Sequence, residues 1–537
     1  MDIIVCNGHI RTMDEHRPLA SAVGIKDGLI ECVGDDSDIL ARKTTGSRVI
    51  DAEGRLVIPG LNDSHLHLLG YAAAKSGVDL NGAKSAREIT ARVREYIDQH
   101  NLPDGVPVIG RGFNDNLFTD KGFPTKADLD AASQSHPIYL ARVCGHLAVV
   151  NSLMLEISGI GKDTMIDGGE ILKGADGQPS GVLTESAMDL AQINKMPYTA
   201  DQLKGLINLV APEFAQMGIT SVQTDDFADM FPRDCVIAAY AAMAYERRLS
   251  LRVTQKRRAP TFGDCRDVLA LSAPHDISSL FRLGPVKLFA DGSLGGRTAL
   301  MLEDYHDQPG SKGVAIHTKE ALFALVALTH KSGGDLAVHA IGDGAISQTL
   351  DAIEAAQKSQ PRKTARHGIV HAQITTPDLL DRFKDLGVFA YVQPIFLRAD
   401  APIAAARVGP KKAAGSYAFK TLMRMGVPVP MGTDCPVEPL DPFDNIYHAV
   451  TRKGMDGRPL NPDQALTVEE AVRAYTSHGA YASHEEHFKG KLTPGYAADL
   501  AILSKNIFEC PAEDIPGTFA FLTMMGGRIV GQYSRLN

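Results

Sequence analysis

Two histidines with one residue between them, His65 and His67, follow an apolar segment in the first part of the chain. Residues 56–60 are apolar and end in Pro-Gly, which is typical of a chain that enters a buried parallel strand. Side chains two residues apart on a strand share a face, so both imidazoles would point to one place. Because the chain contains 18 histidines, this pair indicates a metal site only if further ligands converge on it.

The segments that must position these histidines alternate between strand-like and helix-like patterns. Helix-like segments such as 235–248 and 319–332 separate the strand-like ones. After the strand that carries His65, apolar strand-like runs occur at 218–224, 251–254, 285–291, 336–340, 369–372, 388–392 and 428–434. Eight β-α units predict an α/β fold of the (β/α)8 TIM-barrel type, whose active site lies at the carboxyl ends of the strands.

Both ends of the chain and one long segment do not follow this alternation. Short β-like runs near both termini predict a small composite β-sandwich of residues 1–55 and 490–537, with the barrel spanning 56–489. Residues 72–205 contain a helix-like segment at 85–100, strand-like runs at 106–110 and 137–142, and Gly-rich turns that suggest a hairpin. Because this segment is too long for a loop, we expect an inserted α+β subdomain over the barrel mouth.

Further ligand candidates stand where the predicted barrel strands carry or end in polar side chains. Lys287 belongs to the fourth strand, His339 to the fifth, His371 to the sixth, and Asp434 ends the eighth. Each of these residues alone is more often structural than a ligand. Together with the first two histidines they occupy the places where a barrel builds its site, so the set predicts a metal centre at the barrel mouth.

Lys287 needs a separate explanation, because an ammonium group does not bind a metal. In the middle of an apolar strand, desolvation disfavours the charged amine and lowers its pKa. A neutral amine can take up carbon dioxide and become a carbamate, an anion that is able to bridge two cations. The alternative is a buried ion pair between Lys287 and Asp291.

Composition limits which partners and which cellular compartment are expected for this chain. The chain has 537 residues, 44% of them hydrophobic and 22% charged, as in an ordinary globular protein. Its net charge of -9 and the lack of a long basic block argue against nucleic-acid or membrane partners; residues 256–258 are interpreted as the end of a strand. The odd number of cysteines, without a Cys-x-x-Cys pair, and the absence of a leader or membrane-spanning run predict an unprocessed cytoplasmic protein.

The six candidate ligands and their surroundings resemble the amidohydrolase superfamily, and in particular its YtcJ-like branch, the amidohydrolase-3 family, which includes N-substituted formamide deformylase. The match runs nearly end to end. The segments that carry the resemblance are 57–67, 286–295, 338–343, 371–373, 392–394, 432–437 and 489–500.

This resemblance implies a metal-dependent hydrolase of C–N bonds, in which a metal-activated hydroxide attacks the carbonyl carbon of an amide, N-formyl or N-acyl amine. It implies Zn²⁺, as one or two ions, with other divalent metals as substitutes. His65 and His67 would hold the more buried ion and carboxylated Lys287 would bridge. His339 and His371 would hold the second ion, and Asp434 would act as general base and then as general acid.

The alternative site holds a single ion on His65, His67, one further histidine and Asp434, and leaves Lys287 structural. It would suit a deaminase of a cyclic amidine, or a cyclic-amide hydrolase, on the same fold.

Other matching segments suggest residues that contact the substrate. His146 would stabilise an oxyanion, or alternatively is a loop histidine bonded to backbone. Phe113 and Asn114 stand where the family usually has Trp-Asp, and Arg297 would meet an anionic substrate group or cap a helix. The remaining substrate-binding candidates are Glu185 and Asp291. We expect a small-molecule substrate and allow for a homodimer.

Overall fold

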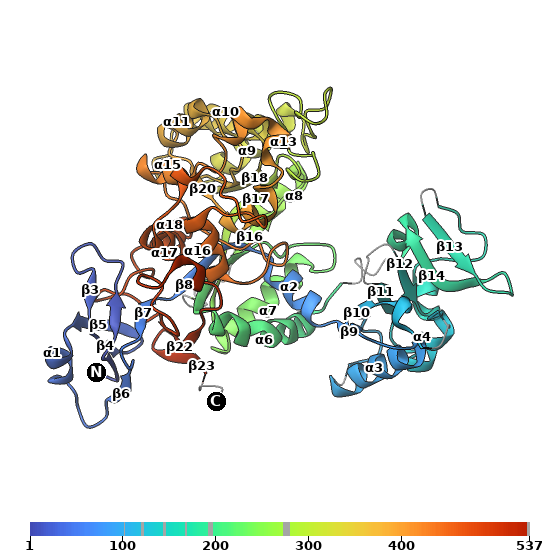
Figure 1. Ribbon diagram of the computed structural model, residues 1–537, viewed down its shortest axis with the longest axis horizontal. Coiled ribbons are helices and arrows are strands. Elements are labelled where there is room, and N and C mark those ends of the chain that lie inside the picture. The colour runs from blue at the N-terminus through green and yellow to red at the C-terminus, as the bar shows by residue number, and fades with distance from the viewer. Residues whose placement is uncertain are drawn as a thin grey trace. The chain divides into compact units, whose positions relative to one another are not determined.

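The structure is a computed structural model that describes residues 1–100, 102–119, 123–142, 147–166, 169–191, 197–271 and 280–533. The chain forms two compact units (Figure 1). One unit comprises Met1–Gly70, Ile207–Phe227 and Val236–Asn537, and the other comprises Tyr71–Leu206 and Ala228–Cys235. No helix in the described ranges has both the length and the apolar character needed to cross a bilayer.

Seven parallel strands form the central sheet of the first unit. In spatial order they are β8 (Leu61–Leu66), β15 (Ile219–Thr224), β16 (Arg252–Arg258), β17 (Phe281–Phe289), β18 (Leu336–Ala340), β19 (Gly368–His371) and β20 (Phe389–Tyr391). Each strand pairs in parallel with the next along the chain, as successive β-α units require. The predicted TIM-barrel fold is confirmed.

An irregular segment closes the ring between β20 and β8. Val392 forms a parallel bridge with Met431 on one side, and Ser64 N donates to Met431 O at 2.9 Å on the other. The segment 428–434, predicted as the eighth strand, therefore lies between β20 and β8 as expected, but it does not form a regular series of β-sheet hydrogen bonds. The reason is that Pro428 and Pro430 have no N–H to donate.

Helices surround the barrel strands. The predicted helices at 235–248 and 319–332 occur as α7 and α9, and Thr318 Oγ1 caps α9 by accepting from Ala321 N. The helices from α6 onward are α6 (Ala200–Gln216), α7 (Arg233–Tyr245), α8 (Phe262–Ala270), α9 (Lys319–Lys331), α10 (Asp343–Ser359), α11 (Pro377–Asp385), α12 (Leu397–Asp400), α13 (Ala404–Val408), α14 (Pro410–Ala413), α15 (Phe419–Arg424), α16 (Pro442–Thr451), α17 (Val468–Tyr475) and α18 (Ser477–Ala482). Two more helices are α1 (Asp36–Leu40) and α2 (Leu68–Lys75).

The same unit contains two further sheets, and the larger one brings strands from both ends of the chain together (Figure 1, blue and red). One has the order β5 (Leu29–Gly34), β4 (Ala22–Lys26), β1 (Ile3–Cys6) and β6 (Arg48–Asp51). The other has the order β23 (Arg528–Gln532), β22 (Ala520–Met525), β21 (Leu500–Leu503), β7 (Leu56–Pro59), β2 (His9–Arg11) and β3 (Leu19–Ala20). The sheets and the barrel belong to one compact unit, so the domain bounds given above stay a prediction.

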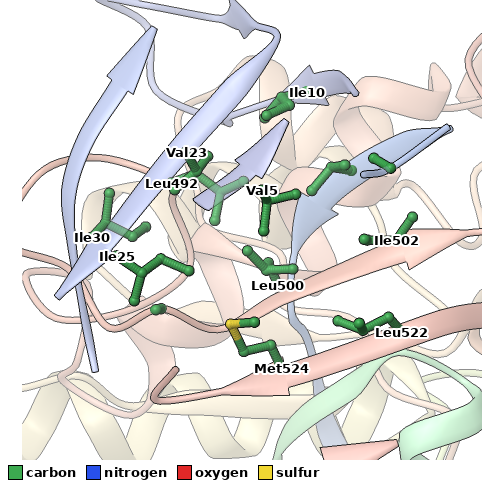
Figure 2. Packing of buried hydrophobic residues seen from close by; sticks show 13 residues of the cluster. Val5, Ile10, Val23, Ile25, Ile30, Leu492, Leu500, Ile502, Leu522 and Met524 are labelled. Atoms are coloured by element: carbon green, nitrogen blue, oxygen red, sulfur yellow. The ribbon is translucent and has the colours of Figure 1, made fainter. Parts of the chain in front are cut away.

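The core between these sheets is aliphatic (Figure 2). Val5, Val23 and Ile25 come from the N-terminal strands, and Leu500 and Met524 come from the C-terminal ones. All five side chains are buried, so each end of the chain supplies apolar surface that the other end covers.

The described part of the second unit contains a mixed sheet and helices that include α3 (Ala86–Gln99), α4 (Lys126–Ala132) and α5 (Ser152–Ile157). The sheet order is β13 (Gly169–Lys173), β14 (Pro179–Glu185), β12 (Leu147–Val150), β11 (Ile138–Arg142), β10 (Val108–Phe113) and β9 (Val78–Asp79). The expected hairpin is the antiparallel pair of β13 and β14. The placement of this unit over the barrel mouth stays a prediction.

A pH-dependent contact supports the closing segment of the barrel. Val429 N donates to His478 Nδ1 at 3.2 Å, and burial lowers the pKa of His478 to about 4. The unfolded chain therefore takes up a proton near pH 6.5, whereas the folded chain does so only near pH 4. We expect the free energy of unfolding to fall by up to about 3 kcal/mol between these values, because of this group.

Urea unfolding at about pH 7 and about pH 4.5 tests this expectation. His478→Asn keeps a hydrogen-bond acceptor for Val429 N but does not titrate in this range, so it should lack this part of the acid sensitivity. Equal pH dependence in the wild type and the variant would contradict the assignment.

Candidate metal centre

Imidazole and carboxylate groups from different strands meet at the carboxyl end of the barrel. Asp434 Oδ1 lies 3.5 Å from His65 Nε2 and 3.3 Å from His67 Nε2, and its Oδ2 lies 4.0 Å from His371 Nε2. One ligand atom each from His65, His371 and Asp434 lies within 4.8 Å of the other two. His339 adjoins this group, since its ring centre is 4.5 Å from that of His371.

The backbone at two of these residues adopts an uncommon conformation. His371 has a φ of 78° and Asp434 a φ of 60°, in the left-handed region that side chains other than glycine rarely occupy. Both residues stand where a barrel segment ends and the chain turns. Such conformations cost about 1–3 kcal/mol each and concentrate at functional sites, where the surrounding structure holds them.

Asp63 fixes the closing segment against the first strand. Its carboxylate accepts from Thr433 Oγ1 at 2.7 Å and from His65 N at 3.2 Å. A Cβ on Gly432 would lie 2.4 Å from His65 N, so only glycine allows this approach. Burial raises the pKa of Asp63 to about 7 despite these hydrogen bonds. This packing sets Asp434 beside His65.

Three of the histidines are held by an oxygen at Nδ1. His67 Nδ1 donates to Asp225 O at 2.7 Å, and His371 Nδ1 lies 2.8 Å from Gln393 Oε1. His339 Nδ1 lies 3.1 Å from Asp291 Oδ1. An acceptor at Nδ1 favours the tautomer with the proton on Nδ1 and the lone pair on Nε2. Histidine ligands of metal sites are commonly held in this way by a hydrogen bond from the other ring nitrogen.

The electrostatic environment keeps two of the imidazoles neutral. Burial, and then the charges of Lys256 and Lys287, hold the pKa of His65 well below its usual value. Burial and the nearby His339 do the same for His371. His67 differs: burial would lower its pKa, but Asp434 raises it to about 9. Since a metal binds only the neutral ring, a cation at His67 competes with a proton.

Asp434 is an ionised, buried carboxylate. Burial alone would raise its pKa, but the hydrogen bond from His67 and the charges of His371, His67 and Lys287 hold the pKa below the usual value. Its Oδ1 is buried and makes no hydrogen bond of good geometry. An ionised carboxylate beside imidazole nitrogens is a donor set that suits zinc. The residues present therefore fit a divalent metal ion.

Comparison with known proteins agrees with this geometry. A model of the amidohydrolase family matches residues 48–531. This chain belongs to the amidohydrolase family. It is 32% identical to the putative amidohydrolase YtcJ of Bacillus subtilis over 99% of this chain and 100% of that protein. It is 27% identical to N-substituted formamide deformylase of Arthrobacter pascens over 96% of this chain and 95% of that one.

A solved structure has the same fold. It is an uncharacterized metal-dependent hydrolase from Pyrococcus furiosus, with a TM-score of 0.76 and 28% identity, and the match covers 94% of this chain and 100% of that one. The resemblance noted from the sequence is thus confirmed at the level of the family.

Lys287 of this amidohydrolase points into the same cluster. Its side chain is buried, and its Nζ lies 3.3 Å from His65 Nε2 and 4.7 Å from the centre of the Phe289 ring. Burial lowers the pKa of the amine to about 8, against the opposing charges of Asp225 and Asp434. A fraction of the amine is therefore neutral near neutral pH, as carbamate formation requires.

Asp291 does not pair with Lys287 among the described contacts. Its oxygens accept from Ile341 N, Gly342 N and Leu300 N, and also lie beside His339 Nδ1. The ion-pair alternative is therefore wrong. This buried carboxylate positions His339, and substrate contact by Asp291 stays a prediction.

The remaining substrate-contact candidates of this amidohydrolase belong to several segments of the chain. Arg297 is paired with Asp307 at 2.9 Å. Phe113 is fully buried in the core of the second unit, and its expected substrate role stays a prediction. Asn114 and Glu185 also belong to the second unit, and Glu185 has a φ of 46°. Substrate contact by these two stays a prediction, and His146 lies outside the described residues.

Three residues that contact the candidate ligands were not among the predicted site residues. They are Asp225 directly after β15, whose backbone oxygen accepts from His67, Lys256 on β16, and Gln393 after β20. Lys256, which the sequence places at the end of a strand, is fully buried. The signal that would have revealed it is the one used for Lys287, a lysine inside a barrel strand near its carboxyl end.

Proposed function

We propose that this amidohydrolase cleaves a carbon–nitrogen bond of a small molecule with the aid of bound zinc or another divalent metal. The observation that carries the proposal is the meeting of His65, His67, His371 and Asp434 at the carboxyl end of the barrel. Active sites of TIM-barrel enzymes lie at this end. By relation to the formamide deformylase, we propose an N-formyl or N-acyl amine as the substrate class.

When bound, zinc would make a nucleophile available from water at neutral pH and polarise the substrate carbonyl. His65, His67 and His371 would hold the ion through Nε2. Asp434 would accept the proton of the attacking water and return it to the leaving nitrogen. The water oxygen forms a bond to the carbonyl carbon, the C–N bond breaks, and the products are a carboxylic acid and an amine.

Lys287 would carry a carbamate in the two-ion form of the site. Its neutral amine would add carbon dioxide and lose one proton, and the resulting anion would supply oxygen ligands for metal ions. His339 and His371 would then hold the second ion. The support for this form is the buried Lys287 amine 3.3 Å from His65 Nε2.

A second candidate follows from the tight group of His65, His371 and Asp434, which suits a single ion. Such a site would serve a deaminase of a cyclic amidine or a cyclic-amide hydrolase. The deaminase would release ammonia, whereas the favoured reaction releases an acid and an amine.

The test is an assay of the purified protein on N-formyl amines, N-acyl amines, cyclic amides and cyclic amidines, with detection of amine, acid and ammonia. We expect amine and acid from the first two classes, and loss of this activity after chelation that added zinc restores. Release of ammonia alone, or turnover that is insensitive to chelation, would reject the proposed function.

A further inference from the structure

Lys256 reaches from the third barrel strand to the first, across the inside of the barrel. It lies on β16, and its Nζ is 2.8 Å from His65 Nδ1 and 2.7 Å from Ser64 O. The second strand, β15, separates these two strands in the sheet. An inward-pointing side chain is what makes this contact possible, and the side chain is fully buried.

The surroundings of the Lys256 amine differ from those of an ordinary buried cation. Its Nζ lies 4.5 Å from the centre of the Tyr391 ring, and within the described ranges no carboxylate is close enough to form an ion pair with it. Buried charges are normally paired. Lys489, which is also buried, has Glu485 at 2.8 Å. The close partners of Lys256 are instead an imidazole nitrogen and a carbonyl oxygen.

Among the described contacts of the four histidines His65, His67, His339 and His371, His65 differs because its Nδ1 has a nitrogen and not an oxygen as its close partner. Its Nε2 faces Asp434 at 3.5 Å and Lys287 at 3.3 Å. The ring has to keep this orientation for Nε2 to bind a metal there. The Lys256 amine occupies the same place relative to His65 that an oxygen occupies for His67, His339 and His371. An uncharged amine that donates to Ser64 O can accept from His65 Nδ1–H with its lone pair, and this direction leaves the lone pair of the imidazole on Nε2.

We propose that Lys256 is a positioning residue of the metal centre, which holds the His65 ring through Nδ1 so that Nε2 faces the metal. The inference rests on the proposed function, because it assumes that His65 is a ligand. Lys256, on the third strand, would thus belong to the site without contacting substrate or metal.

Zinc affinity of the metal-stripped protein, measured by competition with a chelator, tests the proposal. Lys256→Met preserves the length and the apolar stem but removes the hydrogen bonds. Loss of an outer-shell partner weakens metal binding about 10–100-fold, and we expect a loss in this range. Lys489→Met is the matched control, since it removes a buried lysine without contact to the four histidines, and it should bind zinc like the wild type.

Zinc affinity of Lys256→Met equal to that of the wild type would overturn the inference, as would an equal loss in Lys489→Met. A wild type that binds no zinc would overturn the proposed function as well, so the two failures are distinguishable. If Lys256→Met does not fold, a crystal structure of the zinc-loaded wild type tests the proposal instead. The Nζ to Nδ1 contact should remain within about 2.7–3.2 Å, and its loss would contradict the proposal.

Discussion

Replacement of Asp434 by asparagine is expected to lower kcat for N-formyl amine hydrolysis about 10²–10⁴-fold, the range of a general acid–base group. The ionised carboxylate has a buried Oδ1 without a hydrogen bond of good geometry, 3.3 Å from His67 Nε2. Asparagine keeps the shape of the side chain but cannot accept a proton from water. Steady-state kinetics on the zinc-loaded variant measures the effect.

The matched control is Asp226→Asn. Asp226 is also buried, but it follows the second strand and its carboxylate accepts from Leu69 N and Tyr240 Oη. The control should retain hydrolysis. An Asp434→Asn variant with wild-type kcat would remove Asp434 from the proton transfer, whereas equal losses in both variants would indicate a general structural effect.

Replacement of Lys287 by alanine is expected to lower bound zinc from about two ions per chain to about one, with loss of hydrolysis. The reason is that the carbamate is the proposed bridge between the ions, and the Lys287 amine lies 3.3 Å from His65 Nε2. Elemental analysis of protein purified without chelator gives the metal content. The same preparations are assayed on N-formyl and N-acyl amines.

Lys489→Ala serves as the control for removal of a buried lysine, because Lys489 pairs with Glu485 and not with a candidate ligand. Its zinc content should equal that of the wild type. One ion per chain in both the wild type and Lys287→Ala would reject the bridge and favour the single-ion alternative. Two ions in the variant would show that Lys287 is not needed to hold the second one.

The sequence by itself determined the barrel and most of the ligand candidates. Parallel strands covered on both faces are apolar runs, and the helices between them have a different pattern, so the order of elements could be predicted without contacts. His65 and His67 share a face because of the two-residue period of a strand. Because parallel strands end at one edge, residues such as His371 and Asp434 could be assigned to one site although they are far apart in the chain.

Only the tertiary structure decided how these groups are held. Asp291 proved to position His339, and Lys256 proved to contact His65 from two strands away. Phe113 proved to belong to the core of the second unit. The eighth segment closes the ring with an irregular ladder because its prolines cannot donate. Such pairings depend on side-chain packing between segments distant in sequence, and the periodicity of a single strand carries no information about which side chain meets which.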